Sequence, residues 1–351
     1  MQQKRLPIIA FILFFQSSSF CQTIYLIGDA GLHQGSPILP ILKNNINTSQ
    51  DSTDVLLFLG DNIYPSGLHD SSHALRSQDQ LSLAHQFNAI DSFNGTSIFI
   101  PGNHDWNEGN KNGLEFVMRS EQYIKSNSSA IQLPENGKPG PIYFDVNDSL
   151  GIVIFDSQWL IQKREGVDNA TYNTQFFDSL KMIVENEKGK TLLIASHHPL
   201  YTHGSHGGYF TLKDHLFPLT NSSKYLWIPL PVLGSIYPIA RKLGISRQDI
   251  THPLQKEIKR KLEFIFDLHP SIIYASGHEH ALELIEKENA LYIVSGSGSK
   301  TTALNKKSAL FKKSALGYCK LTQIKESMLI EFIYLDQNNS THYFSYTHPA
   351  P

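Results

Sequence analysis

Five short polar clusters, each directly after an apolar run typical of a β-strand, constrain this chain more than any other feature. The clusters are Gly28-Asp29-Ala30-Gly31, Gly60-Asp61-Asn62-Ile63-Tyr64, Gly102-Asn103-His104-Asp105, Ser196-His197-His198-Pro199 and Gly277-His278-Glu279-His280. Gly-Asp and Gly-Asn pairs are common in turns, so a single cluster would carry little information. Five clusters in series, all after strand-like runs, are not explained by turn composition.

The apolar runs and the segments between them predict an α/β protein. Short buried strands are expected over residues 23–27, 55–59, 97–100, 151–155, 191–195, 271–275 and 291–294. Helical patterns lie between them, over residues 37–46, 74–93, 114–125, 174–187 and 253–267. Strand–helix alternation of this kind indicates a sheet covered by helices. Residues 317–346 change to strand–turn–strand with a break at 337–339, which predicts a hairpin at a sheet edge.

The side chains of the five clusters are the types that bind metal ions. In open α/β sheets, ligands bind beyond the carboxyl ends of the strands, so the clusters are expected at one rim. Carboxylate, phenol, carboxamide and imidazole groups suit hard and borderline cations. Two such cations can activate water and hold a phosphate at the same time. The pattern therefore predicts metal-assisted phosphoester hydrolysis.

Composition excludes some function classes. The chain of 351 residues has 30 Lys and Arg against 32 Asp and Glu, a net charge of −2, so overall charge gives no case for a nucleic-acid partner or for an anionic membrane surface. There are only two cysteines, Cys21 and Cys319, so a disulfide framework is excluded. A large core must stabilise the fold instead.

The first 21 residues resemble a signal peptide. Lys4 and Arg5 are followed by an apolar run over residues 6–15 and by small residues before Gln22. The run is short for a membrane span, and no other stretch of the sequence approaches that length. We expect a secreted or periplasmic protein, with a single catalytic domain over residues 22–351. Lipidation of Cys21 is the alternative, but Phe20 fits that signal poorly.

Residues 218–248 interrupt the path between the fourth and fifth clusters. The segment contains an apolar run at 226–233 with Pro229 and Pro231, and later Pro238. Prolines argue against a regular helix or a central strand here. The favoured expectation is a loop packed on the body of the protein. The alternative is a lid over the metal rim that contacts the organic part of a substrate, or a lipid surface.

From about Tyr25 to Gly298, the chain resembles the calcineurin-like metallophosphoesterase superfamily. The resemblance lies in five motifs in the same order: Gly-Asp-x-Gly, Gly-Asp-x-x-Tyr, Gly-Asn-His, His-x-Pro and Gly-His-x-His. More narrowly, it is similar to purple acid phosphatases of the tartrate-resistant type. Most superfamily members carry His where this chain has Gly31, and purple acid phosphatases place a ligand where it has Tyr64. The resemblance implies a four-layer αββα sandwich of two mixed sheets flanked by helices.

The resemblance also implies a ligand set for two metal ions. Asp29, Tyr64 and His280 would bind the first, Asp61 would bridge, and Asn103, His197 and His278 would complete the second. A phenolate favours a trivalent ion, so Fe³⁺ is expected beside Tyr64, with Fe²⁺, Zn²⁺ or Mn²⁺ at the second position. Histidines at i and i+2 point the same way on an extended segment, so Glu279 between them would point away. The spacing to Pro199 favours His197 over His198.

Two further histidines are implied to face the substrate. His104 is the candidate general acid for the leaving oxygen, and Asn103 would also contact the substrate. His206 lies nine residues after His197, where animal enzymes of the family keep a substrate-side histidine, although His203 is close enough to be confused with it. Asp105 and Asp156 are interpreted as groups that support the ligands.

The resulting hypothesis is an exported phosphomonoesterase that uses a metal-activated hydroxide on a small-molecule or protein phosphoester. A phosphodiesterase or nucleotide pyrophosphatase on the same centre is the main alternative. Two other classes are a catalytically silent metal-binding module and a membrane-associated scaffold that uses residues 218–248. The sequence contains no base-stacking or ribose-binding motif that separates the two enzyme classes.

Overall fold

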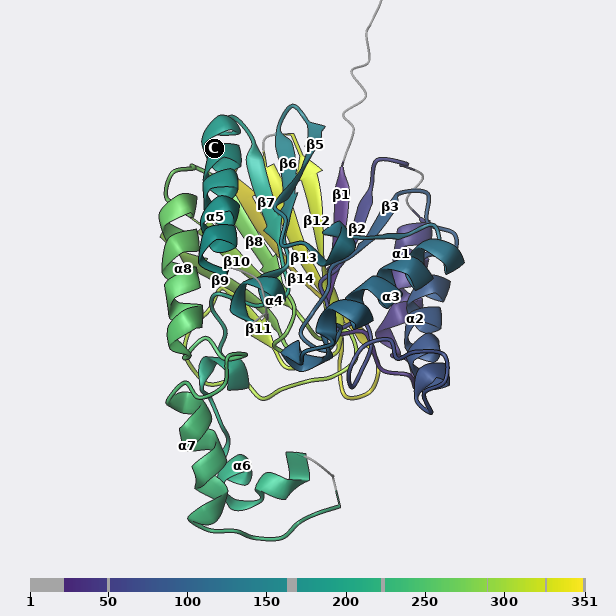
Figure 1. Ribbon diagram of the computed structural model, residues 1–351. Helices are drawn as coiled ribbons and strands as arrows, with labels where there is room; N and C mark the ends of the chain where they lie inside the picture. Colours follow the sequence, from purple (N-terminus) through teal and green to yellow (C-terminus); the bar gives the residue numbers. More distant parts are fainter. Residues whose placement is uncertain are drawn as a thin grey trace, which may run out of the picture.

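The apolar runs of this chain form two mixed β-sheets that stack face to face between layers of helices, as the computed structural model shows (Figure 1). The structure describes residues 22–48, 51–162, 169–221, 225–288, 290–325 and 327–349. The predicted signal peptide and Cys21 lie outside these residues. In the described ranges, no helix has both the length and the apolar character needed to cross a membrane.

Each sheet contains seven of the described strands, and its centre is parallel. Sheet A has the order β14 (Thr341–Pro349), β13 (Ser327–Leu335), β12 (Gly317–Ile324), β1 (Thr23–Ile27), β2 (Val55–Phe58), β3 (Thr96–Phe99) and β4 (Ile131–Gln132). Sheet B has the order β11 (Phe311–Lys313), β9 (Leu282–Lys287), β10 (Ala290–Ser295), β8 (Ile272–Ser276), β7 (Thr191–Ala195), β6 (Leu150–Ile154) and β5 (Ile142–Asn147). β1 to β4 are parallel, as are β6, β7, β8 and β10.

Helices cover the outer face of each sheet. The helices are α1 (Ile38–Asn47), α2 (Arg76–Ile90), α3 (Gly113–Asn127), α4 (Ser157–Ile161), α5 (Asn169–Asn186), α6 (Leu212–Leu216), α7 (Ile236–Lys242) and α8 (Pro253–Phe266). In Figure 1, α1, α2 and α3 lie beside sheet A, and α5 and α8 lie beside sheet B. Short 3₁₀ turns include Ser205–Gly207 and Leu233–Ser235.

Alternating side chains along the strands explain the four layers. On β1, Ile24 and Leu26 face sheet B, in a core that also contains Leu193 and Ile273. The intervening Tyr25 and Ile27 pack with α1 and α2 in a second core. A third core joins sheet B to α5 and α8. Because strand side chains alternate between faces, a strand that is buried on both faces becomes continuously apolar. The predicted αββα sandwich is confirmed.

The predicted elements appear within a few residues of their expected bounds, and short edge elements were missed. The break at 337–339 separates β13 from β14, as in the expected edge hairpin, but the stretch before the break forms two antiparallel strands, β12 and β13, instead of one. Strands β4, β5, β9 and β11 were not predicted. Each lies at or next to a sheet edge, where the apolar pattern is weak.

The segment over residues 218–248 differs from the favoured expectation. Its apolar side chains are exposed rather than packed on the body: Trp227 is 57% exposed, Val232 83% and Leu243 75%. Figure 1 shows α6 and α7 extending away from the two sheets. The expectation of no regular helix is also wrong, because α7 contains Pro238. This proline lies in the first turn of α7, where a missing N–H costs no intrahelical hydrogen bond.

Candidate metal centre

The five polar clusters meet where the two sheets present the carboxyl ends of their central strands. Asp29, Asp61 and Asn103 follow β1, β2 and β3 of sheet A, and His197 and His278 follow β7 and β8 of sheet B. The structure places all seven predicted metal ligands, which include Tyr64 and His280, in one continuous group of contacts. Asp29, Asp61 and His197 have ligand atoms within 4.8 Å of one another.

The Tyr64 hydroxyl is surrounded by acceptors. Its oxygen lies 2.9 Å from Asp29 Oδ1, 3.1 Å from Asp61 Oδ2 and 3.2 Å from His280 Nε2. One hydroxyl has one proton and can donate it to only one of these atoms. Burial, and then the charges of Asp29 and Asp61, raise the pKa of Tyr64 well above its ordinary value. Several electron-pair donors around a single proton are an arrangement that a cation fits.

A second group of predicted ligands consists of Asn103, His197 and His278, and backbone carbonyls fix a ring proton on each of its two histidines. His197 Nδ1 lies 2.8 Å from the Leu59 carbonyl oxygen, and His278 Nε2 lies 2.8 Å from the Gln248 carbonyl oxygen. A carbonyl only accepts, so each of these nitrogens carries the proton. In the neutral rings, the opposite nitrogens, His197 Nε2 and His278 Nδ1, carry lone pairs, although these two nitrogens lie only 3.1 Å apart. Asn103 Oδ1 is a third electron-pair donor, which lies 3.0 Å from His197 Nε2 and 2.9 Å from His278 Nδ1.

Three lone pairs that point at one another repel unless a cation lies among them. The donor set of one carboxamide oxygen and two imidazoles therefore fits a borderline divalent metal ion. Burial, followed by the neighbouring histidines, holds the pKa of His278 well below its ordinary value, which keeps this ring neutral. A neutral imidazole with its second nitrogen hydrogen-bonded is the form that binds metals.

Asp61 connects the two groups. Its Oδ2 contacts the Tyr64 hydroxyl, and its Oδ1 lies 3.3 Å from His197 Nε2. Burial opposes ionisation of this carboxyl, but His197 and His104 lower its pKa below the ordinary range. For His197, burial opposes protonation of the ring, but the negative charges of Asp61 and Asp29 raise its pKa. The two oxygens of Asp61 therefore face two different donor groups, an arrangement that suits a carboxylate shared by two cations.

The backbone around these ligands is constrained. Asp29, Asp61 and His278 all have positive φ, at 58°, 54° and 67°. Non-glycine residues rarely adopt this conformation, and such strain concentrates at functional sites. Gly60 has φ of 94°, and a Cβ atom there would lie 2.4 Å from the His197 ring. A Cβ at Gly31 would lie 2.4 Å from the carbonyl carbon of Asn62, so this backbone leaves no room for a histidine at that position.

His198 and Glu279 lie near the ligands but have other partners. His198 Nε2 is 2.7 Å from the Gln248 side-chain oxygen, and its Nδ1 is 2.7 Å from Ser157 Oγ. His198 is close enough to His197 and His278 to join a metal group, but both of its ring nitrogens are occupied. Glu279 accepts from the backbone N–H of His206 at 2.9 Å. It supports the loop that carries His206 rather than facing the other ligands.

The two predicted substrate-side histidines line one cavity of about 490 Å³. Asp61, Asn103, His278 and His280 contribute to the same walls. His104 Nε2 lies 3.7 Å from Asp61 Oδ2, while its Nδ1 contacts the Pro65 carbonyl oxygen. The His206 ring lies against His278 with 3.9 Å between ring centroids, and its Nδ1 is 2.9 Å from Asp249 Oδ1.

His203 and the two supporting aspartates lie apart from this cavity. His203 is paired through Nδ1 with the buried Glu283. Asp105 accepts from the Gly102 N–H at 2.7 Å, and Asp156 from Trp106 Nε1 at 2.6 Å. Burial is the main cause that raises the pKa of each of these two carboxyls to about 7.

Sequence reasoning missed three residues at this site. Arg241 from α7 bonds Asp249 through Nε at 2.8 Å and lines the cavity. The Gln248 carbonyl orients His278. The Lys300 ammonium lies 3.1 Å from the centroid of the Tyr64 ring, and burial lowers its pKa. Arg241 and Gln248 do not follow a strand, and Lys300 lies after β10 in a loop of glycine and serine that contains none of the expected ligand types, so the pattern of clusters could not reveal them.

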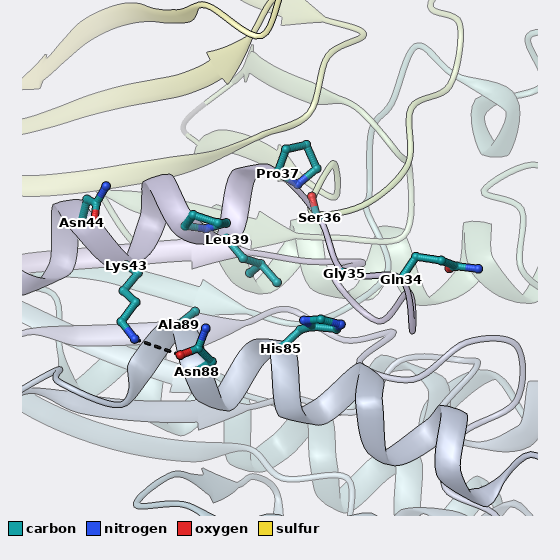
Figure 2. A pocket seen from close by; sticks show the side chains of 11 residues that line it. Gln34, Gly35, Ser36, Pro37, Leu39, Lys43, Asn44, His85, Asn88 and Ala89 are labelled. Atoms are coloured by element: carbon teal, nitrogen blue, oxygen red, sulfur yellow. Dashed lines mark hydrogen bonds between the residues drawn. The ribbon is translucent and has the colours of Figure 1, made fainter.

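A second cavity of about 340 Å³ lies between α1 and α2 (Figure 2). Figure 2 shows Lys43 bonded to Asn88, with His85 beside Gly35. None of the predicted ligands lines this cavity, so it is separate from the candidate metal centre.

Comparisons with known proteins agree with this geometry. The family model of the calcineurin-like phosphoesterases matches residues 23–296. Among solved structures, the chain is similar to the GAP50 anchor in the inner membrane complex of Plasmodium, with 16% identity and a TM-score of 0.56 over 94% of this chain and 89% of that one. It is also similar to PhoD, with 11% identity and a TM-score of 0.55 over 94% of this chain and 70% of that one.

At these identities the two solved structures show a shared fold. A search of curated proteins gives no significant match. The family match covers most of the chain, from β1 to the end of β10, and spans all seven residues of the ligand group. The chain belongs to the calcineurin-like phosphoesterase family, whose members use metal ions.

Proposed function

We propose that this chain is an exported phosphomonoesterase with two metal ions, similar to purple acid phosphatases. The observation that carries the proposal is the pair of donor groups joined by Asp61, because each group holds more lone pairs than protons. If each group held one cation, the Asp61 carboxylate would be shared by the two cations. The secreted or periplasmic location rests on the leader-like residues 1–21 alone.

The proposed ligands divide between the two positions. Asp29, Tyr64 and His280 would hold the first ion, Asn103, His197 and His278 the second, and Asp61 both. Fe³⁺ suits the first position, because a trivalent ion favours the ionised form of a phenol that is otherwise buried beside two carboxylates. When bound, the two ions lower the pKa of water and withdraw charge from a phosphate ester.

Chain residues around the cavity would complete the reaction. His104 has its Nδ1 on a backbone carbonyl, so its Nε2 is the nitrogen available to give a proton to the leaving oxygen. The Asp61 carboxylate lies 3.7 Å from Nε2 of this ring, and the Glu108 carboxylate lies 3.6 Å from Nδ1. His206, held by Asp249, would orient a phosphoryl oxygen. Asn103 would contact the same group.

Hydrolysis assays and two variants test the proposal. Purified protein with bound metal should hydrolyse p-nitrophenyl phosphate, and Asp61→Asn should lose metal content and hydrolysis together. A visible charge-transfer band that disappears in Tyr64→Phe would support iron at the first position. Metal retention with no hydrolysis of any phosphoester would contradict the enzyme and favour a silent binding module.

A phosphodiesterase is the second candidate, favoured by the shape of the cavity. Its wall continues from the ligands to Tyr237, Ala240 and Ile245, which leaves apolar surface for an organic group on the far side of the phosphate. Faster hydrolysis of bis(p-nitrophenyl) phosphate or of a nucleoside diphosphate than of p-nitrophenyl phosphate would select this candidate.

A further inference from the structure

The segment between the fourth and fifth clusters concentrates apolar side chains on the outside of the molecule. We call residues 212–221 and 225–245 the arm; it includes α6 and α7. The arm holds twelve of the twenty-two large apolar side chains that the described ranges expose. Soluble proteins rarely group exposed apolar residues in this way unless the surface binds something.

Three exposed apolar residues of the arm form a stripe along α7. Ile236, Ile239 and Leu243 are spaced three and four residues apart at α7, so they share one face of this helix. The opposite side of the same helix is occupied, because Pro238 is buried and Arg241 bonds Asp249. The chain before α7 adds Trp227 and Val232 to the exposed set.

Basic groups border this stripe. Lys213 and Lys242 are exposed, and the Lys213 ammonium lies 4.9 Å from the centroid of the Trp227 ring. The only acidic residue in the arm is Asp214. Its carboxylate is engaged in capping α6, where it accepts from the Thr211 N–H and hydroxyl at 2.7 Å each. The arm is therefore basic, whereas the whole chain has a net charge of −2.

We propose that the arm docks on the surface of a lipid bilayer that contains anionic headgroups. An apolar face bordered by lysines, with Trp and Tyr side chains, is the composition of a segment that lies in the interface between headgroups and acyl chains. Anionic lipids attract the lysines that flank such a face. An acidic protein partner would explain the charge but not the exposed Trp227 and Val232 together.

Docking would bring the cavity of the candidate metal centre close to the bilayer. Tyr237, Ala240 and Arg241 of α7 line that cavity, and Ile236 and Ile239 of the same helix belong to the docking face. The proposal does not depend on the chemistry of the centre.

Vesicle sedimentation tests the proposal. The protein starting at Gln22, which retains every described element, is mixed with vesicles of phosphatidylcholine alone or with added phosphatidylserine. We expect binding to the anionic vesicles that weakens at about 1 M salt, where charges are screened beyond about 3 Å. The triple variant Trp227→Ser, Leu233→Ser, Leu243→Ser should bind about tenfold less or weaker still, because apolar area drives insertion.

A matched control and a second variant keep the outcomes distinct. Met182→Ser combined with Phe264→Ser removes exposed apolar side chains from α5 and α8 and should bind vesicles like the unaltered protein. Lys213→Glu with Lys242→Glu should lose the preference for anionic lipid. All variants should keep the activity on p-nitrophenyl phosphate. This assay therefore distinguishes failure of the docking proposal from failure of the proposed phosphoesterase function. Equal binding by the triple variant, no vesicle binding by the unaltered protein, or self-association abolished by the triple variant would each overturn the proposal.

Discussion

Individual side chains at the metal centre are held by bonds that also set their chemical state. The Leu59 and Gln248 carbonyls accept hydrogen bonds from one ring nitrogen each of His197 and His278, and the opposite nitrogens face Asn103 at the candidate metal centre. The sequence could predict both histidines, because each follows a strand-like run that stops at a polar cluster. It could not predict which nitrogen faces the site, because both carbonyls come from distant parts of the chain.

At His104, the expected effect depends on the leaving group. His104→Ala should keep its metal content but lose roughly 10²- to 10⁴-fold in kcat on an alkyl phosphate, because an alkoxide leaves poorly without a proton. The loss on p-nitrophenyl phosphate should be much smaller, since that leaving group is stable as an anion. Steady-state kinetics on both esters, with metal analysis, check this. Equal losses on the two esters would remove His104 from the acid role.

At Gly31, any added side chain meets backbone. Gly31→Ala should lower the free energy of unfolding by about 1–3 kcal/mol or more, because its Cβ would lie 2.4 Å from the Asn62 carbonyl carbon. Gly189→Ala is the matched control, since a Cβ there has no atom within 4 Å. Urea unfolding of both variants measures the difference. A Gly31→Ala variant as stable as the control would show that the loop yields without cost.

At Asp156, stability should depend on pH. Burial raises the pKa of this carboxyl to about 7 in the folded chain, above its unfolded value, so the folded state holds the extra proton. The contribution of Asp156 to the free energy of unfolding is complete below about pH 4. It is lost as pH rises through 7, by up to about 1.4 kcal/mol per pH unit. Urea unfolding of metal-free protein at several pH values should show a shallower decline in Asp156→Asn. Parallel curves for the two proteins would contradict the assignment.

Among the elements, β9 does more than extend sheet B. Its Glu283 is buried and accepts from Thr202 Oγ1 at 2.6 Å and from the His203 N–H at 3.1 Å, which anchors the loop that carries His206. Sequence reasoning placed His206 by spacing but missed β9, because the strand shows no clear alternation. The arm was recognised as an interruption, but its exposure depends on packing that no local pattern reveals.

Loosening this anchor should affect substrate handling and leave the metal in place. Glu283→Gln keeps the shape of the side chain but loses charge-assisted bonds to His203, so His206 would be held less firmly. We expect kcat/KM to fall roughly ten- to a hundredfold with unchanged metal content. Glu286→Gln, an exposed position on the same strand, is the control and should change neither quantity. A loss of metal in Glu283→Gln would mean that the anchor acts on the ligands themselves.

For the whole molecule, the parallel order of the central strands determines which residues meet. β1, β2 and β3 of sheet A and β7 and β8 of sheet B all end at the same rim, so residues from Asp29 to His280 converge. Strand–helix alternation made this arrangement predictable. The division of the strands into two sheets was available only through family resemblance, and their order in each sheet was not predicted, because periodicity does not specify which strands pair.

Removing metal should therefore lower the stability of the entire fold. Ions that bind only the native chain stabilise it by about 2.7 kcal/mol when their free concentration is 100 times Kd. We expect chelation to lower Tm by several degrees, and readdition of metal to restore it. Asp61→Asn should unfold at the same temperature with and without chelator. Identical melting curves for the unaltered protein before and after chelation would argue against a bound metal.

The pairing of β1 with β12 has a consequence for how the protein is made. β1, the strand that precedes Asp29, is synthesised before the other described strands, yet its antiparallel neighbour β12 begins only at Gly317. Until β12 is synthesised, the edge of β1 that pairs with it has no partner strand in sheet A. Loading with metal is thus expected to be a post-translational event, and a protein shortened by its final three strands should emerge as an unloaded, protease-sensitive product.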